Sequence, residues 1–196
     1  QTNPPIARRS QDRASVIHQT VLVLDFGSQY TQLIARRLRE LSVYSEILPF
    51  DTPIERLRAR QPAGLILSGG PASVSDPRAP QCDPALFDLG MPVLGICYGM
   101  QVMTAALGGQ VGGAPEREFG HATVTLETDA ALFGSLPMEL RVWASHGDFV
   151  ASAPPGFAVK ATSPNAPVAA MEDRGRRLYG LLFHPEVAHT EHVSSR

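Results

Sequence analysis

Pro92-Val93-Leu94-Gly95-Ile96-Cys97-Tyr98-Gly99-Met100-Gln101 is the stretch of this sequence that decides its fold. A short apolar run leads into glycine, one residue, cysteine, one residue and a second glycine. This spacing is the sulfur counterpart of the G-x-S-x-G nucleophile elbow, in which a sharp strand-to-helix turn exposes a nucleophile above the sheet. Side chains two residues before and after Cys97 would crowd such a turn. The stretch predicts a buried strand, Cys97 at the corner, and a helix that ends at Gly108-Gly109.

Cys97 by itself has two interpretations. A lone cysteine between a strand and a helix is most often a small buried core residue. As a nucleophile it would gain from the helix N-terminus, because the helix dipole favours thiolate and free backbone N–H groups can hold an oxyanion. A histidine and a carboxylate placed to form a triad with Cys97 would decide between the two interpretations.

The composition indicates one soluble globular domain. A chain of 196 residues, 43% hydrophobic and 18% charged, is long enough to bury a core. The net charge of −2 gives no sign of a nucleic-acid partner. Cys82 and Cys97 make no disulfide framework, and no run approaches the roughly 18 apolar residues of a membrane span. We therefore expect a cytoplasmic protein that contacts no membrane.

The first half of the chain alternates strands and helices. Residues 1–20 carry no sustained pattern and predict a poorly ordered extension before a domain at 21–196. The expected elements are strands at 21–25, 43–48 and 64–68, and helices at 29–41 and 53–60. Ser28 is the expected N-cap of the first helix, and Arg36, Arg37, Arg39 and Glu40 are expected on its solvated face. This rhythm predicts a parallel sheet with right-handed crossovers.

The second half changes in character. Short β-branched segments joined by links rich in Gly, Pro and Asn predict strands at 121–127, 141–145, 157–162, 168–172 and 178–183, mostly antiparallel. The fold class expected for the whole is α/β, an open mixed sheet with helices on both faces. Its first half should be parallel and its second half antiparallel.

The last predicted strand leads directly into His184-Pro185-Glu186. Groups at the carboxyl ends of strands gather at one edge of an open α/β sheet, so His184 and Cys97 are expected to meet there. Pro185 fixes the backbone so that Glu186 can lie beside the imidazole and hold it in one tautomer. Taken singly, His184 could be a capping or surface histidine and Glu186 a solvated acid.

Two further clusters follow strands. Gly69-Gly70-Pro71 is either an ordinary turn or a backbone loop that completes an oxyanion hole with the amide of Tyr98. It lacks the pattern of a phosphate-binding loop. Ser145-His146-Gly147-Asp148 follows another strand, and His146 is interpreted as a substrate contact or a structural histidine. No metal site is expected, because the histidines show no consistent ligand spacing; they include His121, His146, His184, His189 and His192.

These motifs resemble the signatures of class I glutamine amidotransferases, the triad type. The resembling stretches are 68–71, 95–101 and 183–186. Within the family, four more stretches resemble the branch fused to a synthetase domain: 24–32, 118–120, 143–148 and 184–190. The resemblance covers residues 21–192, nearly all of the chain after the extension. It implies the family's flavodoxin-like sheet.

The resemblance implies a Cys-His-Glu triad that hydrolyses glutamine. Cys97 would be the nucleophile, His184 the general base and acid, and Glu186 the orienting carboxylate. The thiolate would attack the side-chain amide, His184 would protonate the departing ammonia, and water would release glutamate from the thioester.

Other residues take their expected roles from the same resemblance. Gly70 and Tyr98 would supply the oxyanion-hole amides. Gln101 and the Ser145-His146 region would hold the α-amino and α-carboxylate groups of glutamine. The glutamine step would need no cofactor.

The resemblance also implies a partner. In this branch, ammonia passes to an ATP-pyrophosphatase synthetase domain that converts xanthosine monophosphate to GMP with ATP and Mg²⁺, and the full-length enzyme could be a homodimer. The chain as given is expected to be the glutamine-hydrolysing part, because it contains neither the Ser-Gly-Gly-Val-Asp-Ser phosphate loop nor the last helix of the domain. Phe149 stands where a lysine is common, so no salt bridge is expected from that position.

Two other functions remain open from the sequence. The same elbow could serve an amidotransferase with another acceptor, or a γ-glutamyl hydrolase. A non-catalytic docking or regulatory module, silent without its partner, is the third interpretation.

Overall fold

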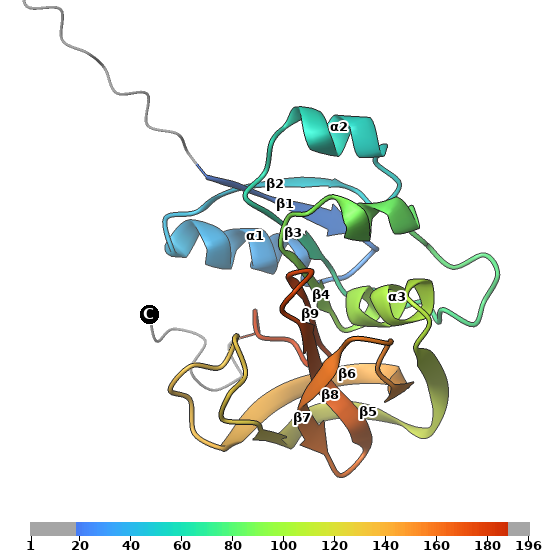
Figure 1. Ribbon diagram of the computed structural model, residues 1–196. Helices are drawn as coiled ribbons and strands as arrows, with labels where there is room; N and C mark the ends of the chain where they lie inside the picture. The colour runs from blue at the N-terminus through green and yellow to red at the C-terminus, as the bar shows by residue number, and fades with distance from the viewer. Residues whose placement is uncertain (1–18, 188–196) are drawn as a thin grey trace, which may run out of the picture.

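A computed structural model of the chain describes residues 19–187, which form a sheet with helices on both faces (Figure 1). This is the α/β architecture that the sequence predicts. The expected extension at 1–20 lies outside the described residues except for its last two positions. His189 and His192 also lie outside the described residues.

The first half of the chain alternates strands and helices as expected, within one or two residues at most boundaries. In chain order its elements are β1 (Thr20–Asp25), α1 (Thr31–Glu40), β2 (Tyr44–Pro49), α2 (Ile54–Ala59), β3 (Gly64–Leu67), the 3-10 helix η1 (Pro84–Asp88), β4 (Val93–Ile96) and α3 (Tyr98–Ala106). The four strands pair in parallel, in the order β2-β1-β3-β4.

Alternating side chains of β1 explain how helices come to cover both faces. Leu22 and Leu24 point into a core shared with α2, η1 and α3. Val23 points the opposite way and packs with Ile34 of α1. Because every second side chain of a strand faces the same side, one apolar run supplies both cores.

Strands make up the second half, and they are longer than predicted. They are β5 (Gln110–Leu126), β6 (Glu139–Ser152), β7 (Ala158–Ser163), β8 (Ala166–Asp173) and β9 (Leu178–Leu181). The prediction of a strand at 141–145 was wrong at its end, because β6 continues for seven residues past Ser145. Antiparallel pairing with β5 carries β6 through this polar stretch, although β5 has a register shift between Gly113 and Glu118.

The pairing of β9 and β7 differs from a simple open sheet with an antiparallel second half. The full order is β2-β1-β3-β4-β9-β8-β6-β5-β7. β9 pairs in parallel with β4 and antiparallel with β8, so its carboxyl end lies at the same edge as that of β4. β7 pairs with both β5 and β8, which curls the last strands around a second apolar core.

The start of α1 differs from the prediction. The helix begins at Thr31 rather than Gln29, its N-cap is Tyr30, and no side chain caps it. Ser28 is therefore not the N-cap; its Oγ accepts a hydrogen bond from the Tyr30 N–H within the preceding turn, at 2.9 Å. A Ser side chain bonding two residues onward stabilises a turn instead of opening a helix.

The elbow between β4 and α3 has the sharp geometry that its glycines predict. Cys97 has φ of 52° and ψ of −109°, a strained conformation for a residue with a side chain. A Cβ on Gly95 would lie 2.7 Å from backbone atoms of Gly99, and one on Gly99 would lie 2.3 Å from the carbonyl oxygen of Leu67. The steric reason for both glycines is confirmed.

No helix within residues 19–187 is long and apolar enough to span a membrane.

We expect Gly99→Ala to lower the free energy of unfolding by about 1–3 kcal/mol or more, because the new methyl group must displace the β3 backbone. Urea unfolding measures the change. Gly113→Ala is the matched control, since its Cβ would meet only Asp148, at 3.8 Å. A Gly99→Ala variant as stable as the control would contradict the close approach of β3 and α3.

Candidate active site

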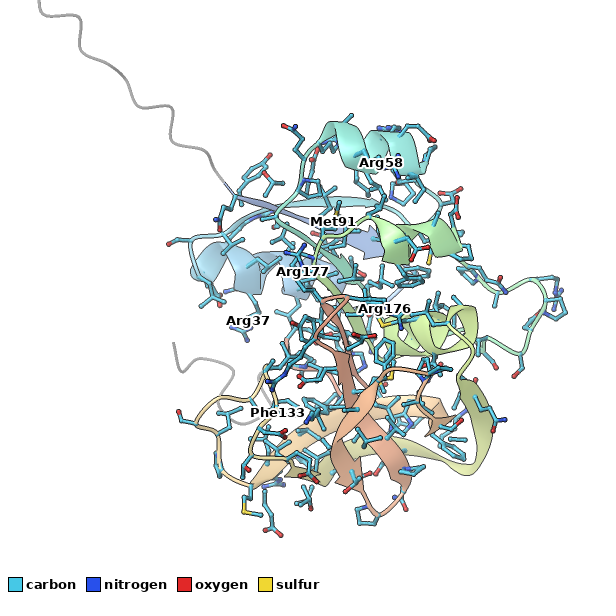
Figure 2. The ribbon with its side chains drawn as sticks, in the orientation of Figure 1. Arg37, Arg58, Met91, Phe133, Arg176 and Arg177 are labelled. Carbon is cyan, nitrogen blue, oxygen red and sulfur yellow. The ribbon has the colours of Figure 1, made fainter. Side chains whose placement is uncertain are left out.

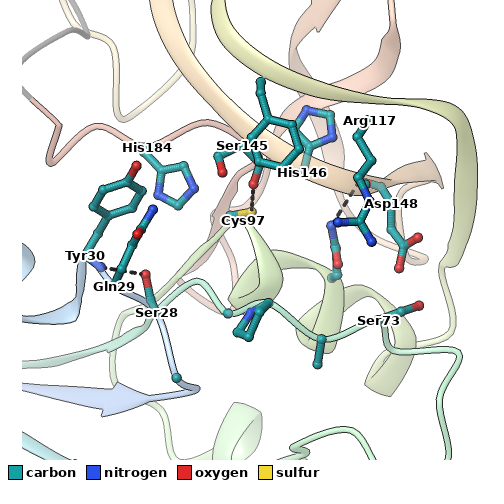
Figure 3. A pocket seen from close by; sticks show the side chains of 17 residues that line it. Ser28, Gln29, Tyr30, Ser73, Cys97, Arg117, Ser145, His146, Asp148 and His184 are labelled. Atoms are coloured by element: carbon teal, nitrogen blue, oxygen red, sulfur yellow. Dashed lines mark hydrogen bonds between the residues drawn. The ribbon is translucent and has the colours of Figure 1, made fainter.

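One pocket of about 350 Å³ lies where the carboxyl ends of the parallel strands meet the curved half of the sheet (Figure 3). Its walls come from the segments that follow β1, β3, β4 and β9, and from the middle of β5 and β6. This volume suits a small molecule such as an amino acid. Of the residues predicted for the site, it is lined by Gly70, Cys97, Gln101, Ser145, His146 and His184.

Cys97 lies at the centre of the pocket wall in Figure 3. Its side chain is buried, and the thiol donates a hydrogen bond to the backbone carbonyl of Ser145, with 3.4 Å between Sγ and O. Directly after Cys97, Tyr98 begins α3. The first N–H groups of a helix have no partner within the helix, so the Tyr98 amide is available beside the thiol.

His184 and Glu186 form a buried pair. His184 Nδ1 lies 2.7 Å from Glu186 Oε1, and each side chain is only 3% exposed. Burial alone would lower the pKa of His184, but hydrogen bonds to Cys97 and Glu186, together with their negative charge, raise the pKa to about 10. The ring of Tyr30 packs edge-on against the imidazole, with 5.0 Å between centroids. The geometry predicted for His-Pro-Glu is confirmed.

The glycine loop after β3 packs under these groups. A Cβ on Gly69 would lie 3.0 Å from His184 Cε1, and one on Gly70 would lie 2.5 Å from the Phe26 carbonyl oxygen. Buried Ser68 fixes the loop, because its Oγ accepts from the Phe26 N–H and donates to the Gly69 carbonyl. Only glycines allow the backbone to approach this closely.

Tyr98 and Glu186 stand behind the pocket wall rather than on its surface. Tyr98 is fully buried and its hydroxyl donates to the Pro80 carbonyl at 2.6 Å, so only its backbone could reach a ligand. Glu186 is reached through His184.

The Ser145-His146-Gly147-Asp148 cluster lies within β6, not after the end of a strand as the sequence predicted. His146 Nε2 lies 3.1 Å from Glu118 Oε2 of neighbouring β5. Burial lowers the pKa of His146, although the charge of Glu118 opposes this. Gln101 Nε2 donates to the Asp148 carbonyl at 3.1 Å, which joins α3 to the same strand.

Sequence reasoning missed two charged residues that line the pocket with Cys97, Arg117 and Asp148. In Figure 3 they lie on the opposite side of Cys97 from Tyr30 and His184. Asp148 Oδ2 is buried without a hydrogen-bond partner among the described residues. The sequence shows Arg117 in the polar stretch just before Glu118, but strand periodicity cannot show that an irregular β5 turns it toward the pocket.

Arg37 also departs from expectation. Predicted on the solvated face of α1, it donates from Nε to the backbone carbonyl of Glu186, at 3.0 Å. Among residues 19–187, no group of three or more His, Cys, Asp or Glu side chains is arranged to hold a metal ion.

A sheet of this order, with a buried thiol at a strand-to-helix elbow beside a His-Glu pair, defines the amidotransferase class of cysteine hydrolases. The chain belongs to the class I glutamine amidotransferase family, whose model matches residues 22–195.

Relatives of known name place the chain more narrowly. It is 58% identical over 174 residues to a glutamine-hydrolysing GMP synthase of Parafrankia sp. (strain EAN1pec), covering 89% of this chain and 33% of that one. It is 57% identical over 173 residues to the same-named protein of Thermobifida fusca (strain YX), covering 88% and 33%. The chain thus spans about a third of the length of these relatives.

Solved structures agree with the family. One is a protein of Thermoplasma acidophilum described as belonging to GMP synthase; it matches with a TM-score of 0.76 and 32% identity, over 90% of this chain and 88% of that one. A glutamine amidotransferase of Thermotoga maritima matches with a TM-score of 0.67 and 25% identity, over 87% and 77%.

The free energy of unfolding should depend on pH through His184. Its pKa is about 10 in the folded chain, against about 6.5 for an unfolded histidine. Because the folded state binds the proton more tightly, His184 contributes stability that is complete below pH 6.5 and is lost as the pH rises toward 10. The stability difference between the unsubstituted chain and His184→Gln should therefore shrink across this window.

Urea unfolding at several pH values measures that difference. His121→Gln, at an exposed position of β5, is the matched control. A difference that stays constant from pH 6.5 to 10 would show that the raised pKa of His184 is wrong.

Proposed function

We propose that this chain hydrolyses glutamine to glutamate and ammonia with Cys97, His184 and Glu186 as its catalytic residues. The observation that carries the proposal is the buried His184-Glu186 pair, 2.7 Å apart, in the same pocket as the strained Cys97. A core cysteine needs neither the strain nor the charged neighbours. Structures store such strain mainly at functional sites.

The reaction follows from these groups. Cys97 thiolate attacks the side-chain carbonyl carbon of glutamine and forms a C–S bond, while the carbonyl electrons move to oxygen. The imidazolium of His184 gives its proton to the amide nitrogen as the C–N bond breaks and ammonia leaves. His184 then takes a proton from water as the water attacks the thioester, which releases glutamate and restores the thiol. Glu186 holds the imidazole in the tautomer that these steps need.

The oxyanion formed in each attack needs donors on one side of Cys97. We assign this role to the backbone amides of Tyr98, at the N-terminus of α3, and of Gly70, in the loop that lines the pocket. Nothing in these steps calls for a cofactor, since thiolate, imidazole and backbone amides provide all the chemistry.

The far side of the pocket suits the α-amino and α-carboxylate groups of glutamine. Gln101, Ser145 and His146 are the residues first assigned to it, and they line the pocket. Arg117 and Asp148 add one charge of each sign at the same place. A zwitterion is matched by such a pair, and the unpartnered Asp148 Oδ2 is an acceptor for the substrate ammonium.

The acceptor of the ammonia is proposed from the relatives. Two of them, more than half identical to this chain, are named glutamine-hydrolysing GMP synthases. By analogy, ammonia made here would pass to an ATP-pyrophosphatase synthetase domain that converts xanthosine monophosphate to GMP with ATP and Mg²⁺. We place this work in the cytoplasm, as part of an enzyme that could act as a homodimer.

A γ-glutamyl hydrolase or another amidotransferase would use the same elbow. The discriminating experiment supplies the full-length protein with xanthosine monophosphate, ATP and Mg²⁺, and either glutamine or ammonia as the nitrogen source. GMP formed from both sources supports the proposal. Glutamate release with no GMP from either source would point to a hydrolase or another acceptor.

We expect Cys97→Ala to abolish glutamine hydrolysis, because no other group in the pocket can form the thioester. Glutamate release by the full-length protein, with the synthetase substrates present, is the measurement. Ammonia-dependent GMP formation should survive in this variant. Cys82→Ala is the control and should keep its activity, since Cys82 lies outside the pocket. Glutamine turnover retained in Cys97→Ala would rule out the nucleophile.

Asp148→Asn should raise KM for glutamine roughly tenfold, the scale of one lost charge-assisted hydrogen bond, with a smaller change in kcat. Steady-state kinetics of glutamate release make the comparison. Asp76→Asn, on an exposed loop outside the pocket, is the control. An unchanged KM would show that the substrate ammonium binds elsewhere.

A further inference from the structure

Helix α1 contacts the His184-Glu186 pair twice, although it contributes no group to the reaction. Tyr30, at its N-cap, packs edge-on against the His184 ring. Arg37, two helical turns further on, donates from Nε to the Glu186 carbonyl. Seven residues span about two turns of a helix, so both side chains project from the same face. Figure 2 shows Arg37 on the side of α1 that faces the curved half of the sheet.

The Glu186 carboxylate has few partners of its own. Oε1 lies 2.7 Å from His184, whereas Oε2 is buried with no hydrogen-bond partner among the described residues. The position of the carboxylate must therefore be set largely through its backbone. Glu186 lies after the last residue of β9, so no strand pairing holds its peptide groups. The hydrogen bond from Arg37 supplies that fixed point from outside the segment.

Arg37 differs in this respect from the arginine beside it. Both Arg36 and Arg37 pair with Glu40, at 3.1 Å and 2.8 Å. The Arg36 side chain is 73% exposed, whereas that of Arg37 is 25% exposed because it turns inward to Glu186. A residue that served only the helix surface would have no reason to lose its solvation in this way.

We propose that Arg37 is a positioning residue: it holds the Glu186 backbone so that the carboxylate stays within hydrogen-bond distance of His184. The inference rests on the proposed function for its kinetic consequence. Without this hydrogen bond, Glu186 would sample positions further from the imidazole. The imidazolium would then be less stabilised, and fewer Cys97 side chains would be present as the thiolate paired with it.

Three substitutions separate the hydrogen bond from the charge. In Arg37→Gln, the side-chain nitrogen takes the place of Arg Nε, so a donor remains without charge. Arg37→Met is of similar length and has no donor. Arg37→Lys keeps the charge but has a methylene group at the Nε position. We expect the Gln variant to behave nearly as the unsubstituted chain does, and the Met and Lys variants to share the same defect.

The first measurement is the rate of Cys97 alkylation by iodoacetamide in the 196-residue chain at neutral pH, followed by mass spectrometry so that Cys82 is counted separately. Because a disordered Glu186 weakens the thiolate-imidazolium pair, the rate at Cys97 should fall roughly threefold to tenfold in the Met and Lys variants. It should stay within about twofold in the Gln variant. Arg36→Met, which loses only the Glu40 pair, is the control and should react at the unsubstituted rate.

The second measurement is glutaminase kinetics in the full-length protein, where the Met and Lys variants should lower kcat roughly tenfold with little change in KM. Equal alkylation rates in the Met variant and the unsubstituted chain would overturn the proposal, as would a Gln variant as slow as the Met variant. If the Met variant does not fold by urea unfolding, the comparison of Lys with Gln decides in the same way. Failure of the proposed function would appear instead as glutamine turnover in Cys97→Ala.

Discussion

The close approach of α3 to β3 is the constraint on which the site depends. Gly99 lies so near the Leu67 carbonyl that no side chain fits between them. This contact forces the chain to turn within one residue, and Cys97 takes a left-handed conformation that costs on the order of 1–3 kcal/mol. Burial of the β4 and α3 side chains in the main core offsets that strain.

Both halves of the sheet are needed to complete the pocket. The parallel half places Cys97, the glycine loop and His184 at one edge. The curved half brings the Ser145 carbonyl to the thiol and accepts the His184 N–H at the Trp143 carbonyl, at 3.0 Å. Because β9 pairs with β4 on one side and β8 on the other, His184 sits at the junction of the two halves. The catalytic geometry is thus a property of the whole sheet.

Local rules predicted the parts of the site that depend on local chemistry. The spacing of Gly95, Cys97 and Gly99 defines a turn, and His184 follows a strand end. Arg117 and Arg37 escaped prediction for a different reason. Arg117 reaches the pocket beside an irregular register in β5, which no periodicity reveals. Arg37 lies among surface charges on its helix, and only the tertiary fold brings Glu186 beside it.

The double pairing of β7 has a consequence for self-association. A strand at the margin of a sheet exposes unpaired N–H and C=O groups, which can recruit a strand from another molecule. Here β7 uses both of its sides, on β5 and β8, so among the described strands β2 is left with one free side. β2 has six residues and ends at Pro49, which offers no N–H. The fold therefore presents little template for intermolecular β-pairing.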